Sequence, residues 1–496
     1  MTTSSSRTSR LLLCAAILAA ALCTSCSIFG NAHDRKQQLM VDYKTGHNTE
    51  MAPWIEEQAK DRGEKEEVMW RLEGGSLAFY TGRHQDAVDN FKRAEELIDE
   101  YDGRATVSVR DVAATTGSLL LNDNTRPYRG SCRDRIALCF YKSLAYLGTG
   151  REDAFRAQIR RLRDAQKAAR DQIDAEAKGA ADNAAQDRQD NPNVTDDDLP
   201  SMEAIAGQSQ NKSIAKSLEH CRQLAADANA DFLNPAALFL SGLSSLRDGR
   251  ADAAAIDFRQ AVAAQPGSLA LKQYLKAAML AAGQKLPADL KEVPGVGFPL
   301  DRQCVYVLFG HGHTAALEQV SLILPLPGGL VPAAFALCQF YPSPFSGLDV
   351  TTADGVSAST RLADMDAIMA QEYQLALPAM ITRIVLKAAI YAVSQEVIRR
   401  SDMNSLAKAA SLLALSATAA VFNSTDTRCW ELLPKELQLA QLPMPKDRKV
   451  QLALKCHSAP PISIPVEIAP GAGSAILYVN APTRDNISVQ VLPLAR

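Results

Sequence analysis

Residues 75–94 read GSLAFYTGRHQDAVDNFKRA, and residues 242–261 read GLSSLRDGRADAAAIDFRQA. Both stretches place Gly, Gly, Ala, Phe and Ala at successive steps of seven, five, four and three residues. Steps of four and three put the last three residues on one face of a helix. The second glycine marks the turn between two helices, where a residue without a β-carbon is tolerated best. Each stretch therefore predicts a helical hairpin closed by small residues.

This spacing is similar to that of the tetratricopeptide repeat, in which helical pairs stack into a solenoid. Pro266 follows the second stretch by five residues, as expected where a helix has ended. A weaker third unit lies at residues 141–156, where the alanine comes one position early. The alternative interpretation is generic helical hairpins with small residues at their crossings, which also stack into a helical solenoid.

The N-terminus has the features of an export signal. Two arginines precede an apolar stretch, Leu11–Leu22, that is too short to span a bilayer, because a spanning helix needs roughly 20 residues. Residues 23–26 read CTSC, which resembles the bacterial lipobox, although Cys23 stands where that motif usually has an aliphatic residue. We expect residues 1–25 to be a signal peptide and Cys26 to be acylated, with ordinary signal-peptidase cleavage as the alternative. By the same resemblance, the residue after Cys26 favours an outer-membrane lipoprotein that faces the periplasm.

Composition divides the rest of the chain into five segments. They are a tether (26–66), a first helical block (67–168), a charged helix with a flexible linker (169–212), a second helical block (213–290) and a C-terminal domain (291–496).

The C-terminal domain changes from helical to strand patterns. Strand runs are predicted at 304–309, 317–326, 436–441, 450–454, 463–468, 475–480 and 487–491. Between them lie two helices, an amphipathic one at 364–400 with Pro378 as a kink or restart, and a very apolar one at 405–422 that we expect to be a buried core helix. We therefore predict an α+β fold, in which the helical solenoid is followed by antiparallel strands with the two helices packed on them.

Several motifs resemble a family of large bacterial lipoproteins with tetratricopeptide-like helices and no settled biochemical function. They are the LNDNTRPYRG segment (121–130), VLFG (307–310), LPLP (324–327), TDTR with the following tryptophan (425–430), and the Leu-Pro pairs at 433–434 and 442–443. The chain departs from the family at residues 311–315, where an acidic residue and a glycine are more usual. The resemblance implies an envelope role near cell-wall assembly or lipoprotein secretion, and it brings no catalytic residues.

The loop at residues 122–134 is the preferred functional surface. It offers polar, aromatic and charged side chains, and the candidate partner-binding residues are Asn122, Asp123, Tyr128, Arg129, Arg133 and Asp134. The alternative is structural, because Asp and Ser commonly cap helices. Capping explains Asp123 and Ser131, but it explains Tyr128 next to Arg129 less well.

A second candidate cluster contains Asp426, Arg428 and Trp430. In a strand these three side chains would alternate with their neighbours and share one face. Two readings remain open: an Asp-Arg ion pair that orders a sheet edge under Trp430, or a ligand-contacting site.

Signals for metal or nucleophilic chemistry are weak. His311 and His313 flank a glycine at a strand end, but no third ligand stands at motif spacing. The cysteines after Cys26 contain no CxxC pair, and no Gly-x-Ser-x-Gly or His-Glu-x-x-His motif occurs. The sequence therefore predicts no catalytic residue, metal or cofactor.

The formal net charge of −3 gives no support for nucleic-acid binding. Because the sequence has repeat-like spacing but no recognisable set of catalytic residues, it favours a membrane-anchored envelope scaffold that binds protein partners. The alternative is a glycan- or peptidoglycan-binding protein that uses Tyr128 and Trp430, and a metal-dependent hydrolase at the two histidines comes third. The sequence leaves the oligomeric state open.

Overall fold

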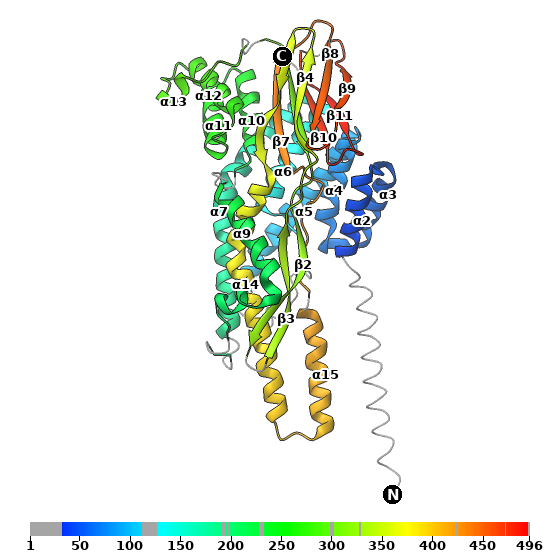
Figure 1. Ribbon diagram of the computed structural model, residues 1–496, viewed down its shortest axis with the longest axis vertical. Coiled ribbons are helices and arrows are strands. Elements are labelled where there is room, and N and C mark those ends of the chain that lie inside the picture. The colour runs from blue at the N-terminus through cyan, green and yellow to red at the C-terminus, as the bar shows by residue number, and fades with distance from the viewer. Residues whose placement is uncertain are drawn as a thin grey trace.

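The computed structural model describes residues 32–111, 126–189, 194–195, 199–227, 233–297, 302–326, 329–422, 424–471 and 473–494. Helices form the N-terminal part of the chain and sheets dominate the C-terminal part (Figure 1). The prediction of an α+β fold with this order of parts is confirmed.

Helices account for most of the described chain up to residue 291. In order they are α2 (Ala32–Thr45), α3 (Asn48–Asp61), α4 (Glu67–Tyr80), α5 (His84–Asp111), α6 (Cys132–Gly148), α7 (Glu152–Gln189), α8 (Met202–Ala206), α9 (Lys212–Asp227), α10 (Pro235–Arg247), α11 (Ala251–Ala264), α12 (Leu269–Ala281) and α13 (Ala288–Lys291), with 3-10 turns at Gly63–Lys65 and Ser209–Asn211.

Helices α2 and α3 lie where the sequence predicted a tether. Leu39 and Tyr43 of α2, and Met51 and Ile55 of α3, are all buried in the main core. In each pair the residues stand four apart, so both fall on one helical face. Where the sequence suggested a tether followed by a first helix, residues 32–61 form two helices, because apolar side chains at helical spacing bury one face of each although the segment is polar on average.

The turns of the two matched hairpins have the conformation that the glycines predicted. Gly82 between α4 and α5 has φ +77°, and Gly249 between α10 and α11 has φ +72°. The residue after each glycine, Arg83 or Arg250, donates a backbone hydrogen bond of 2.8 Å to a carbonyl in the last turn of the preceding helix. A glycine in the left-handed conformation, followed by such a hydrogen bond, is a common way for a helix to terminate.

The first glycine of each stretch lets its two helices approach closely. A β-carbon on Gly75 would lie 2.4 Å from the ring of Phe91, and one on Gly242 would lie 2.7 Å from the ring of Phe258. Both phenylalanines are completely buried. The same glycine–phenylalanine contact therefore joins the helices of both hairpins.

The two helical blocks pack against each other through α7 and α10. The Arg163 guanidinium on α7 donates hydrogen bonds to Ser241, Ser245 and buried Asp257, the last at 2.6 Å. These contacts connect the two blocks across residues 190–234 of the sequence.

The strands form three sheets. They are β1 (Cys304–His311), β2 (Ala316–Leu326), β3 (Gly329–Gln339), β4 (Phe345–Thr352), β5 (Gly355–Ala358), β6 (Thr360–Asp364), β7 (Glu436–Pro443), β8 (Lys449–Cys456), β9 (Ile462–Glu467), β10 (Ser474–Ala481) and β11 (Ser488–Leu494). The sheets have the orders β11-β10-β1-β7-β6, β5-β4-β8-β9 and β2-β3. The expectation of antiparallel pairing fails for β1 and β10, which are parallel. No hairpin joins these two strands, so nothing forces them to run in opposite directions.

The five-stranded sheet lies between the helices and the four-stranded sheet. Tyr306 and Leu308 of β1 belong to the core that includes the helices, whereas Val305, Val307 and Phe309 belong to the core shared with β4 and β8. This alternation follows the two-residue period of a strand. A strand covered on both faces is fully buried, and β1 is buried along its whole length.

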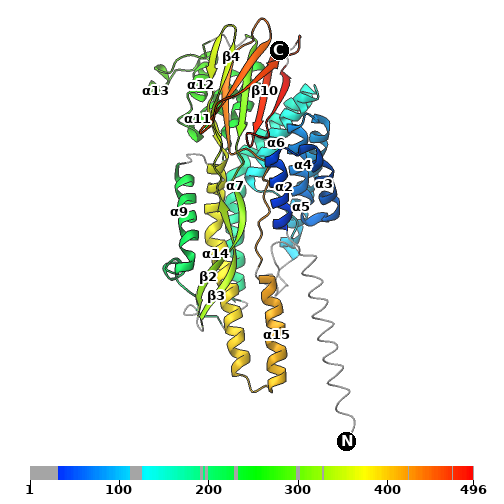
Figure 2. The same ribbon diagram turned by 45° about the vertical axis from the view of Figure 1, so that its right-hand side comes forward.

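Helices α14 (Met365–Arg400) and α15 (Ser405–Phe422) form an antiparallel pair that extends beyond the rest of the protein (Figures 1 and 2). Pro378 lies within α14, and the helix continues through it. The prediction that residues 405–422 form a buried core helix is wrong, because Leu406 is 69% and Leu413 is 60% exposed. Apolar composition indicates a preference for an apolar environment but does not say what provides it.

Candidate functional site

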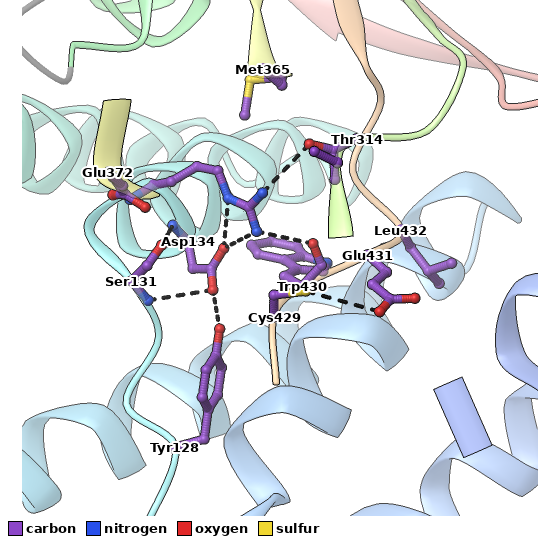
Figure 3. A network of polar contacts seen from close by, with 12 residues as sticks. Tyr128, Ser131, Asp134, Thr314, Met365, Glu372, Cys429, Trp430, Glu431 and Leu432 are labelled. Carbon is purple, nitrogen blue, oxygen red and sulfur yellow. Dashed lines mark hydrogen bonds and ion pairs between the residues drawn. The ribbon is translucent and has the colours of Figure 1, made fainter. Parts of the chain in front are cut away.

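The two predicted binding clusters meet around the irregular segment 424–435. This segment runs between the N-terminal helices and the sheet, and it brings Trp430 beside the start of α6 (Figure 3). We call the contacts of this segment with Tyr128–Asp134 and α4 the joint. Residues 424–431 are not a strand, so the strand geometry from which a shared face of Asp426, Arg428 and Trp430 was predicted is absent.

The start of α6 is fixed by a capping box. The Ser131 hydroxyl accepts the backbone N–H of Asp134, and the Asp134 carboxylate accepts that of Ser131. The predicted capping role of Ser131 is confirmed. Tyr128 donates its hydroxyl proton to the same carboxylate.

Arg133 lies at the centre of the joint and is only 2% exposed. Its guanidinium donates to Asp134 Oδ1 at 2.9 Å, to the Trp430 carbonyl at 3.1 Å and to Thr314 Oγ1 at 3.4 Å. Its backbone N–H donates to Glu372 of α14. A buried charge is stable only when paired and hydrogen-bonded, and Arg133 meets that condition with groups from four parts of the chain.

Trp430 is wholly buried. Its indole Nε1 donates to Ser76 Oγ on α4 at 2.9 Å, and its ring lies 5.9 Å from Phe91 and 6.0 Å from Tyr141, centroid to centroid. A sugar ring cannot stack on an indole that is enclosed in this way. The glycan-binding alternative therefore loses one of the two aromatic groups on which it rested.

Two further buried ionisable side chains bind the same segment. Glu73 of α4 accepts the backbone N–H groups of Glu431 at 2.8 Å and Leu432 at 3.0 Å, and burial raises the pKa of Glu73 to about 8. Lys36 of α2 donates to the Thr427 carbonyl at 2.6 Å and forms an ion pair with Glu431. Sequence reasoning missed both, since a glutamate or lysine in an amphipathic helix normally faces solvent.

Arg428 and Asp426 form the predicted ion pair, with Nη2 and Oδ2 2.6 Å apart. Arg428 also donates to the carbonyls of Lys65 and Arg126, and its guanidinium lies 5.7 Å from the Tyr128 ring centroid. The remaining candidate, Arg129, is exposed and pairs with Asp102 at 3.3 Å. Cys26, Asn122 and Asp123 lie outside the described residues.

The two histidines at the end of β1 lie in different surroundings. His311 Nδ1 shares a hydrogen bond of 2.8 Å with Ser343, and its Nε2 faces Glu436 at 3.5 Å. Burial opposes ionisation of Glu436, but its bonds to His311 and Arg361 bring its pKa down to about 2. His313 lies against the Tyr341 ring, and burial lowers the pKa of His313 to about 4. Among the described residues, no group of three or more His, Cys, Asp or Glu side chains is arranged to hold a metal ion.

An accessible groove of about 860 Å³ lies on the other side of α4, between α3 and α5. Its lining residues are Asn48, Thr49, Ala52, Pro53, Ile55, Glu56, Arg71, Gly74, Ala78, Thr81, Arg83, Asp86, Asp89, Asn90 and Arg93. The sequence does contain a signal for this groove, a polar face on α5 beside its buried apolar face. The polar face is formed by Asp86, Asp89, Asn90 and Arg93, and the buried face by Ala87, Phe91 and Ala94.

The groove balances its charges and holds several of them in fixed positions. It contains three arginines and three acidic residues. Arg71 Nη1 lies between Glu56 Oε2 at 2.6 Å and Asn90 Oδ1 at 3.1 Å. Arg93 pairs with Glu67 at 3.1 Å, and Arg83 pairs with Asp86 at 3.3 Å. A groove with charges of both signs and with fixed hydrogen-bond donors and acceptors suits a polar chain such as a peptide, whose backbone and side chains also offer donors and acceptors.

Three comparisons with known proteins give no relative from which a role could be transferred. No family model, no curated protein and no solved structure matches this chain.

Proposed function

We propose that this chain is a lipid-anchored scaffold of the bacterial cell envelope and that the groove between α3, α4 and α5 binds an extended segment of a protein partner. The observation that carries this proposal is the groove itself, which is accessible and is lined by equal numbers of basic and acidic side chains. Most of the predicted binding residues around Trp430 are buried, so they are better suited to fix the helices onto the sheet than to meet a partner. The lipid anchor rests on the sequence around Cys26.

The helical part is proposed to be a tetratricopeptide-like solenoid. In support, the α4–α5 and α10–α11 hairpins share the close glycine–phenylalanine contact and the left-handed glycine turn. A third glycine in this conformation, Gly150 with φ +71°, joins α6 to α7. Repeated helical pairs of this kind commonly bind partners along a curved inner surface.

The scaffold proposal is tested by affinity capture of the full chain from crosslinked envelopes. We expect wild type to enrich a reproducible protein partner, and we expect the groove variant Asp86→Arg/Arg93→Glu, which conserves net charge, to lose it. Glu219→Arg/Arg222→Glu on α9 is the matched control, because it also conserves net charge, exchanges an exposed local ion pair and lies away from the groove. Equal capture by wild type and the groove variant, or no reproducible partner, would overturn the proposal.

The anchor is tested separately by metabolic labelling with a clickable palmitate analogue. Label should appear on the wild-type chain and be absent from Cys26→Ala. Equal labelling of the two chains, or none on wild type, would remove the anchor and leave the groove hypothesis intact.

A further inference from the structure

The projecting end formed by α14 and α15 exposes apolar side chains to an unusual degree. Val397, Met403, Leu406 and Leu413 are 39–69% exposed, and Leu330 at the turn of the β2–β3 hairpin is 55% exposed. Figures 1 and 2 both place these elements at the same end of the molecule. Single exposed apolar residues are common, but a group of them at one end marks an interaction surface.

The outward face of α15 is apolar along its described length. Its exposed residues are Ser405, Leu406, Ala409, Ala410 and Leu413. The last four stand at steps of three, one and three, so they form one stripe on the helix, and none carries a charge. The charged side chain of Lys408 instead bonds to the Arg399 carbonyl at 3.0 Å. A helix that turns such a stripe away from its own protein needs another apolar environment.

Helix α14 is also apolar and largely uncovered by the rest of the protein. By length and composition alone it is apolar enough to cross a membrane, and only 22% of its most apolar 18-residue window is buried. Its end carries Arg399 and Arg400, whose side chains are 62% and 80% exposed. Long basic side chains beside an apolar surface can reach lipid headgroups while their stems stay in apolar surroundings.

The placement of α2 favours lipid over a second protein as the occupant. In both views α15 lies on the same side of α14 as α2 and α3 (Figures 1 and 2). Cys26, the expected acylation site, precedes the start of α2 by six residues, a reach of about 20 Å when extended. An acyl chain there would hold this side of the protein close to a bilayer.

We propose that the outward face of α15, together with the adjoining end of α14, inserts into the interfacial region of a lipid bilayer. Leu406, Ala409, Ala410 and Leu413 would lie at the acyl boundary, with Arg399 and Arg400 among the headgroups. This second contact rests on the membrane anchor of the proposed function and is independent of the groove. The acylated terminus alone would hold the chain at the membrane, and an inserted helix face would fix the orientation of the protein on the bilayer.

The test places the photo-crosslinking residue p-benzoylphenylalanine in the full acylated chain, reconstituted in phosphatidylethanolamine–phosphatidylglycerol vesicles. It replaces Leu406 or Leu413, with Ile256 on α11 and Val356 on β5 as controls, because these are 54% and 67% exposed but lie elsewhere. We expect lipid adducts from positions 406 and 413, at roughly tenfold the yield from the controls, as for a leucine side chain transferred from water to lipid.

Three outcomes would overturn the lipid contact: no adduct at 406 and 413, equal lipid adducts at all four positions, or adducts to a second copy of the chain. Each is distinguishable from failure of the proposed function, because acylation of Cys26 and capture by the groove are measured independently.

Discussion

Trp430 and Ser76 are 354 positions apart in the sequence, and the Trp430 indole Nε1 donates a 2.9 Å hydrogen bond to the Ser76 hydroxyl. Through this contact the segment between α15 and β7 enters the core of the first helical hairpin. The surrounding bonds of Glu73, Arg133 and Lys36 fix the same segment from three other sides. The joint therefore makes the helices and the sheet one continuous structure.

Replacing Trp430 tests how much the joint stabilises the protein. Trp430→Ala should lower the free energy of unfolding by about 3–5 kcal/mol, because it leaves a large cavity among Phe91 and Tyr141. Ser76→Ala should cost about 1–3 kcal/mol, since it removes only the acceptor of the buried indole N–H. Denaturant unfolding followed by circular dichroism measures both. A Trp430→Ala loss no greater than that of Ser76→Ala would contradict this packing role.

Glu73 should make stability depend on pH. Its pKa is about 8 in the folded protein and about 4.3 in an unfolded chain. Between these values the folded state holds a proton that the unfolded state has released, so the contribution of Glu73 to the free energy of unfolding falls as pH rises. Glu73→Gln cannot titrate, and it should gain stability relative to wild type between about pH 5 and about pH 8. Denaturant unfolding of both proteins across this pH range measures the difference in their free energies of unfolding. A difference that does not change with pH would show that Glu73 does not titrate there.

The close helix contacts predict opposite effects of two alanine substitutions. Gly75→Ala should destabilise by about 1–3 kcal/mol, because its β-carbon would overlap the Phe91 ring. Gly103→Ala in α5 meets nothing within 4 Å and should stabilise by up to about 1 kcal/mol through helix propensity alone. Thermal unfolding of the two variants measures both effects, and equal shifts in the same direction would refute the contact.

Arg163 should matter for the packing of the two helical blocks. Arg163→Ala leaves the buried Asp257 carboxylate without its main partner, and we expect a loss of roughly 1–3 kcal/mol. Arg161→Ala on the same helix is the control, because its side chain is 58% exposed and pairs with Glu95 of α5, so it should contribute less than about 1 kcal/mol. Hydrogen exchange would locate the effect: amides of α10 should exchange faster in Arg163→Ala only.

Local patterns in the sequence predicted local structure well. In each hairpin, the spacing of the two glycines and the phenylalanine was enough to predict the turn and the small-residue helix crossing. The predicted strand runs at 304–309 and 475–480 lie within β1 and β10. Strand β3 was missed, because Pro332 and a run of small residues hide its strand pattern.

The joint could not be predicted in the same way. The sequence identified Tyr128, Arg133, Asp134, Arg428 and Trp430 as two separate clusters, and the fold brings them together. A polar or aromatic residue looks the same in sequence whether it serves a buried network or a surface. Which of the two applies depends on contacts between residues hundreds of positions apart, such as Arg133 with Trp430. Exposed α15 shows the converse, an apolar pattern that resembles a core helix.

Partner binding in the groove is tested most directly by comparing two positions of the full chain in living cells. A photo-crosslinking residue replaces Asp89 in the groove or Arg129 at the exposed edge of the joint. We expect a discrete protein adduct from position 89 and none from position 129. An adduct from position 129 with none from position 89 would contradict this expectation and return partner binding to the loop that precedes α6.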